Sequence, residues 1–154
     1  MRGRVNYLLG LPSKAREDHI PWVTYTDPEL AHVGLTEAHA REKHGSKVEV
    51  VRFGYDENDR AIAERATEGS IKVVVVKGKP VGATIVGKDA GNLIGVWALA
   101  LANGLKMSQV AGMVAPYPTL GEVSKRAAGA YFAPRLFESR AVKRAVRLVQ
   151  SRLR

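Results

Sequence analysis

The sequence contains no cysteine, no glycine-rich nucleotide loop and no apolar run long enough to cross a bilayer. Without cysteine, a disulfide framework, a cysteine-based zinc site and a cysteine nucleophile are all excluded within this chain. Neither G-x-G-x-x-G nor G-x-x-x-x-G-K-[ST] occurs, so neither phosphate-binding motif is present. The most apolar segment, Asn92–Ala102, is far shorter than the roughly 20 residues that a membrane span needs.

Length and composition are those of one globular domain. The chain has 154 residues, of which 45% are hydrophobic and 25% are charged, so it can form a real core. The first twenty residues are largely polar and carry one short apolar patch, Tyr7–Leu11, which is too short for a signal sequence. We therefore expect a cytoplasmic protein with no membrane span. Residues 1–19 are expected to form a linker or the end of a preceding segment.

The net charge of +9 is concentrated at the C-terminal end. Lys125–Arg154 holds nine Lys or Arg residues and a single acid, Glu138. Such a basic end can bind nucleic acid, an anionic membrane surface or an acidic partner. A solvated helix face is the simpler explanation, because like charges on helices mostly face water. No aromatic residue follows Phe137, which disfavours a base-stacking surface.

Turn signals and apolar periodicity divide the chain into strands and helices. The predicted strands are Trp22–Thr26, His32–Leu35, Lys47–Phe53, Ser70–Lys77 and Pro80–Gly87. The predicted helices are Glu37–His44, a turn within Ala61–Ala66, Asn92–Ala102, Ser108–Met113, Thr119–Ala130 and Leu136–Arg152, with a charged loop over Tyr55–Arg60. Because most strands precede most helices, we expect an α+β fold, an antiparallel sheet with helices packed on one face.

Several of these predictions have a clear local cause. Thr36 is a suitable N-cap for the first helix, and Gly45 is a suitable stop. The pair Gly78-Lys79 separates two Val/Ile-rich runs, which predicts a β-hairpin. The four consecutive valines Val73–Val76 indicate a strand that is covered on both faces.

Two segments contain residue types that occur in binding sites. Gly87–Gly91 precedes a helix, whose free N–H groups could hold an anion, but a tight strand-to-helix turn is the favoured interpretation. His39 and His44 are five residues apart and do not share a helix face. With no acidic residues at a suitable spacing from the histidines, we expect no metal site.

The segment Ala115–Glu122 is the most informative one in the chain. Thr119 is followed three residues later by Glu122, which is the pattern of a capping box at the start of a helix. Pro118 would stiffen the chain where it enters that helix. From the residues alone, capping is the favoured role for both side chains.

Beyond these local patterns, an ordered set of short motifs resembles the C-terminal dimerisation (interface) domain of the flavin-dependent pyridine nucleotide–disulfide oxidoreductases. The resemblance covers residues 20–133 and ends in a motif similar to His-Pro-Thr-x-x-Glu. The matching segments, in order, are Pro21–Leu30, Val33–Glu37, Asp59–Ala61, Gly69–Val73, Gly82–Gly87, Ala90-Gly91 and Tyr117–Glu122.

The resemblance implies a homodimer in a longer enzyme that uses FAD and NAD(P)H. Residues 1–19 would be a linker or the tail of a missing flavin domain, and residues 134–154 a basic helical extension. In the family, the closing motif reaches the partner subunit's flavin and disulfide, where its His exchanges protons with a thiol and its Glu positions the His. The resemblance thus gives Tyr117 and Glu122 catalytic positions, and it places Tyr117 and Pro118 beside the partner's flavin.

One departure from the family pattern matters. Tyr117 stands where the family has His, and a phenol with an ordinary pKa of about 10 is a poor base near neutral pH. The chain also lacks the C-terminal cysteine pair of the mercuric reductases in that family. We expect the isolated domain to be inactive, to bind no cofactor or metal by itself, and not to bind nucleic acid. A small basic module that binds nucleic acid or an anionic surface through its last helix is the alternative.

Overall fold

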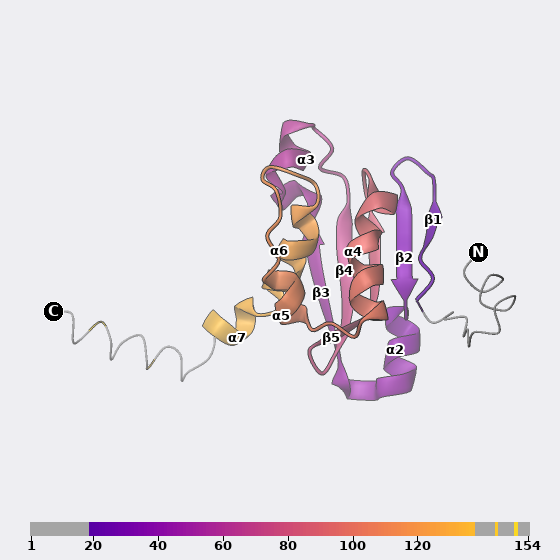
Figure 1. Ribbon diagram of the computed structural model, residues 1–154, viewed down its shortest axis with the longest axis vertical. Helices are drawn as coiled ribbons and strands as arrows, with labels where there is room; N and C mark the ends of the chain where they lie inside the picture. The colour runs from indigo at the N-terminus through magenta and orange to yellow at the C-terminus, as the bar shows by residue number, and fades with distance from the viewer. Residues whose placement is uncertain (1–18, 138–143, 145–149, 151–154) are drawn as a thin grey trace, which may run out of the picture.

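The computed structural model describes residues 19–137 together with positions 144 and 150 (Figure 1). Its five strands form one sheet in the order β1-β2-β5-β4-β3, and every neighbouring pair is antiparallel. The strands are β1 (Trp22–Thr24), β2 (Leu30–Gly34), β3 (Val48–Gly54), β4 (Ser70–Val76) and β5 (Lys79–Val86). The helices are α2 (Glu37–His44), α3 (Asp59–Ala63), α4 (Ala90–Ala102), α5 (Met107–Ala111), α6 (Glu122–Ala130) and α7 (Ala133–Phe137). The expected α+β fold is confirmed.

The central hairpin joins β4 to β5 through the predicted tight turn. Lys77 and Gly78 both have positive φ, 50° and 75°, as in the two-residue turns that match the twist of a hairpin. The register then places Val73 opposite Ala83 and Ile71 opposite Ile85. The hairpin therefore brings β4 and β5 to the middle of the sheet, where both strands are covered by neighbours on each side.

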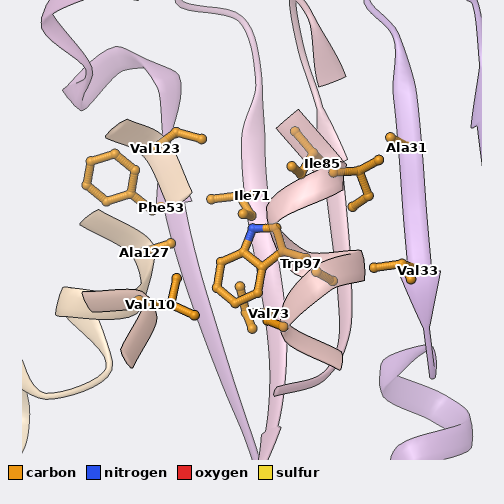
Figure 2. Close-up of a cluster of buried hydrophobic side chains, with 14 of the residues drawn as sticks. Ala31, Val33, Phe53, Ile71, Val73, Ile85, Trp97, Val110, Val123 and Ala127 are labelled. Carbon is orange, nitrogen blue, oxygen red and sulfur yellow. The ribbon is translucent and has the colours of Figure 1, made fainter. Parts of the chain in front are cut away.

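The main core lies between the sheet and the helices α4, α5 and α6 (Figures 1 and 2). Trp97 of α4 is fully buried and lies over Ile71 and Val73 of β4. Its indole Nε1–H donates a hydrogen bond of 3.0 Å to the hydroxyl oxygen of Ser124 on α6, which is also fully buried. Because each polar atom satisfies the other, the bond fixes α4 against α6 inside the core.

A smaller core lies on the opposite face of the sheet, at the end where α2 packs. Ala40 of α2 is buried with Val48 of β3 and Val74 of β4. Val73 and Val75 face the main core instead, so the run of valines is covered from both sides, as expected. The helix begins and ends as predicted: the Thr36 hydroxyl accepts a hydrogen bond from the His39 N–H.

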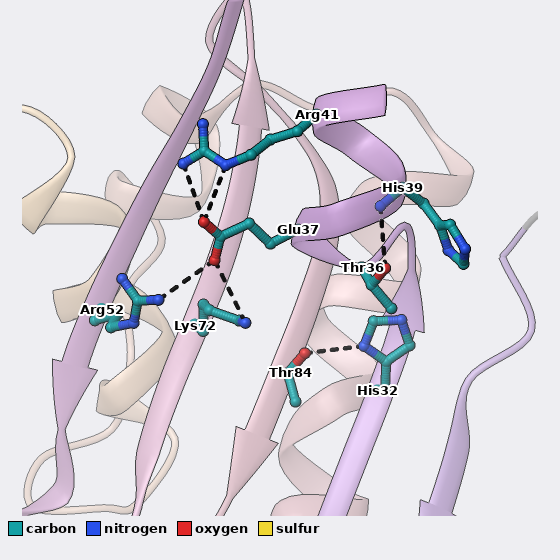
Figure 3. A network of polar contacts seen from close by, with 8 residues as sticks. All are labelled: His32, Thr36, Glu37, His39, Arg41, Arg52, Lys72 and Thr84. Carbon is teal, nitrogen blue, oxygen red and sulfur yellow. Dashed lines mark hydrogen bonds and ion pairs between the residues drawn. The ribbon is translucent and has the colours of Figure 1, made fainter. Parts of the chain in front are cut away.

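The same face carries a network of charges, shown in Figure 3. Arg52 and Lys72 are direct cross-strand partners on β3 and β4. Like charges in such a position repel each other. The carboxylate of Glu37 lies 3.3 Å from Arg52 and 3.6 Å from Lys72, and it also binds Arg41 one helical turn along α2. One carboxylate thus lies within reach of three cations and reduces the repulsion between them.

The predicted loop over Tyr55–Arg60 is wrong. Residues 55–57 form a 3₁₀ turn, and α3 already begins at Asp59. Tyr55 is fully buried, and its hydroxyl donates to the Lys88 carbonyl at 3.2 Å. A Cβ on Gly87 would lie only 2.7 Å from the Tyr55 ring, so this glycine leaves the space that the ring fills. The charged composition of the segment concealed one large core side chain.

Other boundaries differ by a few residues from the prediction. Strand β1 ends at Thr24, two residues early, and β2 begins at Leu30. The predicted helix over 136–152 and the predicted linker over residues 1–19 lie largely outside the described residues. None of the helices in the described part of the chain combines the length and apolar character that a bilayer crossing requires.

Candidate functional site

The segment between α5 and α6 forms a surface loop, and the buried side chain of Asn58 is hydrogen-bonded to it. This asparagine is fully buried and caps α3, because its Oδ1 accepts a hydrogen bond from the Ala61 N–H at 2.9 Å. Its Nδ2 donates to the carbonyl oxygen of Thr119 at 3.2 Å. The start of α3 and the loop before α6 are therefore connected through one side chain.

Tyr117 lies on the outer side of this loop. Its side chain is 70% exposed, and the flanking Pro116 and Pro118 are exposed as well. The Tyr117 hydroxyl donates a hydrogen bond of 2.9 Å to Oδ2 of Asp59, the first residue of α3. The peptide bond between Tyr117 and Pro118 is cis. Asp59 is a site residue that sequence reasoning missed, since no spacing rule connects positions 58 residues apart.

Electrostatics keep this phenol protonated. The hydrogen bond to Asp59 and the negative charge of Asp59 raise the pKa of Tyr117 above its ordinary value. The negative charge of Glu122 adds to the increase, whereas Arg126 opposes it. At neutral pH, Tyr117 is therefore a neutral side chain that donates a hydrogen bond to Asp59, and its basic phenolate form is still less populated than that of free tyrosine.

The predicted capping box at Thr119 and Glu122 is wrong. The Thr119 hydroxyl donates to the Pro116 carbonyl at 2.7 Å, and α6 begins only at Glu122, with Gly121 at the N-cap position. A threonine hydroxyl often bonds to a nearby carbonyl instead of capping a helix, and here that local bond closes the loop. Glu122 is half-buried at the start of α6, where a negative charge is favourable. The hydroxyl of Tyr117 is bonded to Asp59 rather than to Glu122.

Two cations from the basic C-terminal segment stabilise the fold itself. The Arg126 guanidinium lies 5.2 Å from the centre of the Phe53 ring and donates to the Glu57 carbonyl. Arg135 lies 4.1 Å from the centre of the Tyr131 ring and binds Glu49. Most of the remaining positive charge after Phe137 lies outside the described residues.

The turn at Gly87–Gly91 and the buried histidine of β2 have structural roles. The Gly91 N–H, in the first turn of α4, donates to the carboxylate of Glu29 at 2.9 Å, so the chain supplies its own anion there. His32 is nearly buried, and its ring nitrogens lie 2.9 Å from the Thr84 hydroxyl and 3.0 Å from the Gly34 carbonyl. Within the described ranges, no group of three or more His, Asp or Glu side chains is arranged to hold a metal ion.

Comparison with known proteins gives consistent results. Residues 20–128 match the family model described as "Pyridine nucleotide-disulphide oxidoreductase, dimerisation domain". Dihydrolipoyl dehydrogenase of Bacillus subtilis (strain 168) is 35% identical over 123 residues, which cover 79% of this chain and 26% of that protein. Dihydrolipoyl dehydrogenase of Geobacillus stearothermophilus is 37% identical over 123 residues, again 79% of this chain and 26% of that protein.

Solved structures show the same fold. The HOCl-induced flavoprotein disulfide reductase RclA from Escherichia coli has a TM-score of 0.76 and 25% identity, over 83% of this chain and 30% of that chain. LpdA from Mycobacterium tuberculosis has a TM-score of 0.75 at 24% identity, over 83% of this chain and 28% of that chain, a likeness of fold alone. The chain therefore spans about a quarter of the length of the curated relatives that it matches.

Proposed function

Because the chain belongs to the pyridine nucleotide-disulphide oxidoreductase family through its dimerisation domain, we propose that it pairs with a second copy about a two-fold axis. We further propose that the loop carrying Tyr117 and Pro118 then completes the active site of the partner subunit in a longer enzyme that uses FAD and NAD(P)H. The observation that carries this proposal is the exposed Tyr117, which stands at the family's His position on a loop anchored by Asn58.

Two exposed apolar side chains, one on α4 and one in the loop between α5 and α6, support a contact surface there. Leu99 of α4 is 62% exposed and Val114, in the loop before α6, is 96% exposed. Leu99 thus lies on one of the helices that cover the main core, and Val114 lies in the loop that joins two others. A two-fold interface uses the same patch on both chains, so one such patch is sufficient for self-association.

The residues of the loop suit contact with a planar ring system but not cofactor binding by this chain alone. Three consecutive exposed side chains with rings, Pro116, Tyr117 and Pro118, can pack against a flat group on a facing subunit. The sequence has no glycine-rich loop for a dinucleotide phosphate. In the whole enzyme the flavin would supply the redox chemistry, and this domain would contribute shape and polar groups. The domain alone is therefore inactive in this proposal.

A tyrosine at position 117 gives the loop a different proton chemistry from that of the family's histidine. A histidine at this position takes up and releases a proton near neutral pH. The Tyr117 phenol stays protonated, because Asp59 raises its pKa. Tyr117 therefore serves as a neutral polar contact, and the proposed enzyme depends less on proton transfer at this position than a His-containing relative does. Glu122 keeps a negative charge close to the loop.

A domain exchange tests the proposal. Residues 20–133 would replace the corresponding domain of the Bacillus subtilis dihydrolipoyl dehydrogenase, and the chimera would be loaded with FAD. We expect a dimer whose turnover of dihydrolipoamide is lower than that of the parent and rises with Tyr117→His, because the imidazole restores a base at neutral pH.

The matched control is Tyr25→His in the same chimera. Tyr25 is also highly exposed, at 82%, but lies outside the loop and the helical layer. The Tyr25→His substitution should leave the turnover of the chimera unchanged. If Tyr117→His and Tyr25→His gave the same turnover in a dimeric, flavin-loaded chimera, the loop would not contribute to the partner's active site.

A further inference from the structure

Asp59 and Tyr117 come from distant parts of the sequence and meet on the surface beside α6. We propose that Asp59 is the positioning residue for Tyr117. Its carboxylate accepts a hydrogen bond from the phenol, so that the lone pairs of the hydroxyl oxygen point outward and can accept a hydrogen bond. The bond itself is 2.9 Å long and joins the Tyr117 hydroxyl to Oδ2 of Asp59. The hydrogen bond does not depend on the proposed function. That proposal enters only in placing the group that faces this acceptor on a partner subunit.

The position of Asp59 is fixed by its neighbours. It is the first residue of α3, where a carboxylate is favoured by the free N–H groups of the helix. The preceding residue, Asn58, caps the same helix and also holds the Thr119 carbonyl. Two consecutive residues thus hold the loop at two points, one through its backbone and one through the Tyr117 side chain.

The other charged groups around Tyr117 do not take this role. Glu122 and Arg126 of α6 influence the phenol through their charges, in opposite directions. Arg126 is bound to the Glu57 carbonyl and lies against the Phe53 ring. The hydrogen bond of the phenol goes to Asp59, which leaves Glu122 as a charge at a distance.

The hydrogen bond to Asp59 decides which side of the Tyr117 hydroxyl donates and which side accepts. A tyrosine hydroxyl has one proton to donate and lone pairs that accept. Because the hydroxyl proton is directed at Asp59, the side of the hydroxyl oxygen that faces away from α3 can accept a hydrogen bond from a donor such as a thiol, an amide or a water molecule. A hydroxyl bonded to a carboxylate is also a better acceptor, because hydrogen bonds in a chain polarise one another.

Titration of the phenols by NMR tests the pair directly on the chain as it exists. The protein would be labelled with ¹³Cζ-tyrosine; the chain has five tyrosines, and Tyr117→Phe identifies the signal of interest. We expect the Tyr117 signal to titrate above the ordinary value of about 10 in the wild type, and at lower pH in Asp59→Asn. The matched control is Glu122→Gln, which removes a charge from the same surroundings without touching the hydrogen bond; its shift should be the smaller one.

A shift in Asp59→Asn no larger than that in Glu122→Gln would overturn the proposal. Far-UV circular dichroism of each variant shows whether it is folded, and Asp59→Ser, which keeps a residue suited to a helix start, serves if Asp59→Asn unfolds. Asp59→Glu should retain a raised midpoint, because its carboxylate can still accept the bond. Self-association is measured separately by sedimentation, so a monomeric chain would contradict the proposed dimer without affecting the titration result.

Discussion

The side-chain amide of Asn58 donates a hydrogen bond of 3.2 Å to the backbone carbonyl of Thr119, and so connects two segments that are 61 residues apart. The same side chain caps α3 through the Ala61 N–H. The loop that presents Tyr117 is therefore positioned by a buried polar residue in a different element, and its geometry depends on that residue as well as on its own sequence.

Substitutions of Asn58 should separate its two tasks. Asn58→Ala removes the cap and the loop anchor, and the N–H of the buried Ala61 loses its acceptor; we expect it to lower the free energy of unfolding by about 1–3 kcal/mol. Asn58→Ser keeps an oxygen that can cap α3 but does not reach Thr119, so it should cost less. Urea unfolding measures the stabilities.

Amide hydrogen exchange in the same two variants distinguishes the tasks locally. Exchange in the loop 114–121 should accelerate in both, because both lose the bond to Thr119. Exchange in α3 should accelerate only in Asn58→Ala. Equal protection of the loop in the wild type and in both variants would show that Asn58 does not anchor it.

Two glycine substitutions should have opposite effects. A Cβ on Gly82 would lie 1.9 Å from the Leu35 carbonyl oxygen, a backbone atom that has no room to move away, so Gly82→Ala should cost about 3 kcal/mol or more. A Cβ on Gly95, inside α4, meets nothing within 4 Å. Gly95→Ala should stabilise the protein by up to about 1 kcal/mol, through helix propensity.

Urea unfolding at one fixed protein concentration compares the two glycine variants with the wild type. A Gly82→Ala protein with wild-type stability would mean that β5 and the segment after β2 lie further apart than described. A destabilised Gly95→Ala would mean that this side of α4 is packed closely against something, a second copy being the first candidate.

Removal of Glu37 should weaken the protein in a pH-dependent way. The hydrogen bond and charge of Arg41, with the charges of Lys72 and Arg52, hold the pKa of Glu37 below its ordinary value of 4.5. A carboxyl group with a lowered pKa stabilises the folded state above its ordinary pKa, and this contribution is lost as the pH falls through the lowered value. The pairs are partly exposed, so we expect Glu37→Gln to cost less than about 1 kcal/mol at pH 7.

The stability difference between the wild type and Glu37→Gln should shrink as the pH falls below the ordinary value of 4.5, and it should disappear below the lowered pKa of the folded state, where both proteins carry a neutral side chain. It should also shrink in about 1 M salt, because salt screens exposed charges. Urea midpoints at neutral and acidic pH measure it, with Glu42→Gln on the exposed side of α2 as the control. A difference that stayed constant with pH would exclude the ion network as its source.

Local signals predicted much of the fold. The cap at Thr36, the stop at Gly45 and the turn at Gly78 each act within a few residues, and each was confirmed. The valine run Val73–Val76 predicted coverage on both faces because a strand exposes alternate residues to opposite sides. These features are set by the physics of neighbouring residues, which a sequence displays directly.

The candidate site was harder to predict because its partners are distant in sequence. The spacing of Thr119 and Glu122 fits a capping box, but the Thr119 hydroxyl turns to the Pro116 carbonyl instead. Asp59 lies in a segment that carries the family resemblance, but no sequence pattern connects it or Asn58 with the loop that both contact in the fold. The family resemblance located Tyr117, whereas its hydrogen-bond partner required the three-dimensional structure.

The central claim, that this chain is built to pair with a copy of itself, is tested most directly by sedimentation equilibrium over a range of concentrations up to tens of micromolar. We predict a particle mass that approaches twice the chain mass of 16.7 kDa as the concentration rises. A mass that stays at 16.7 kDa throughout the range would contradict the account.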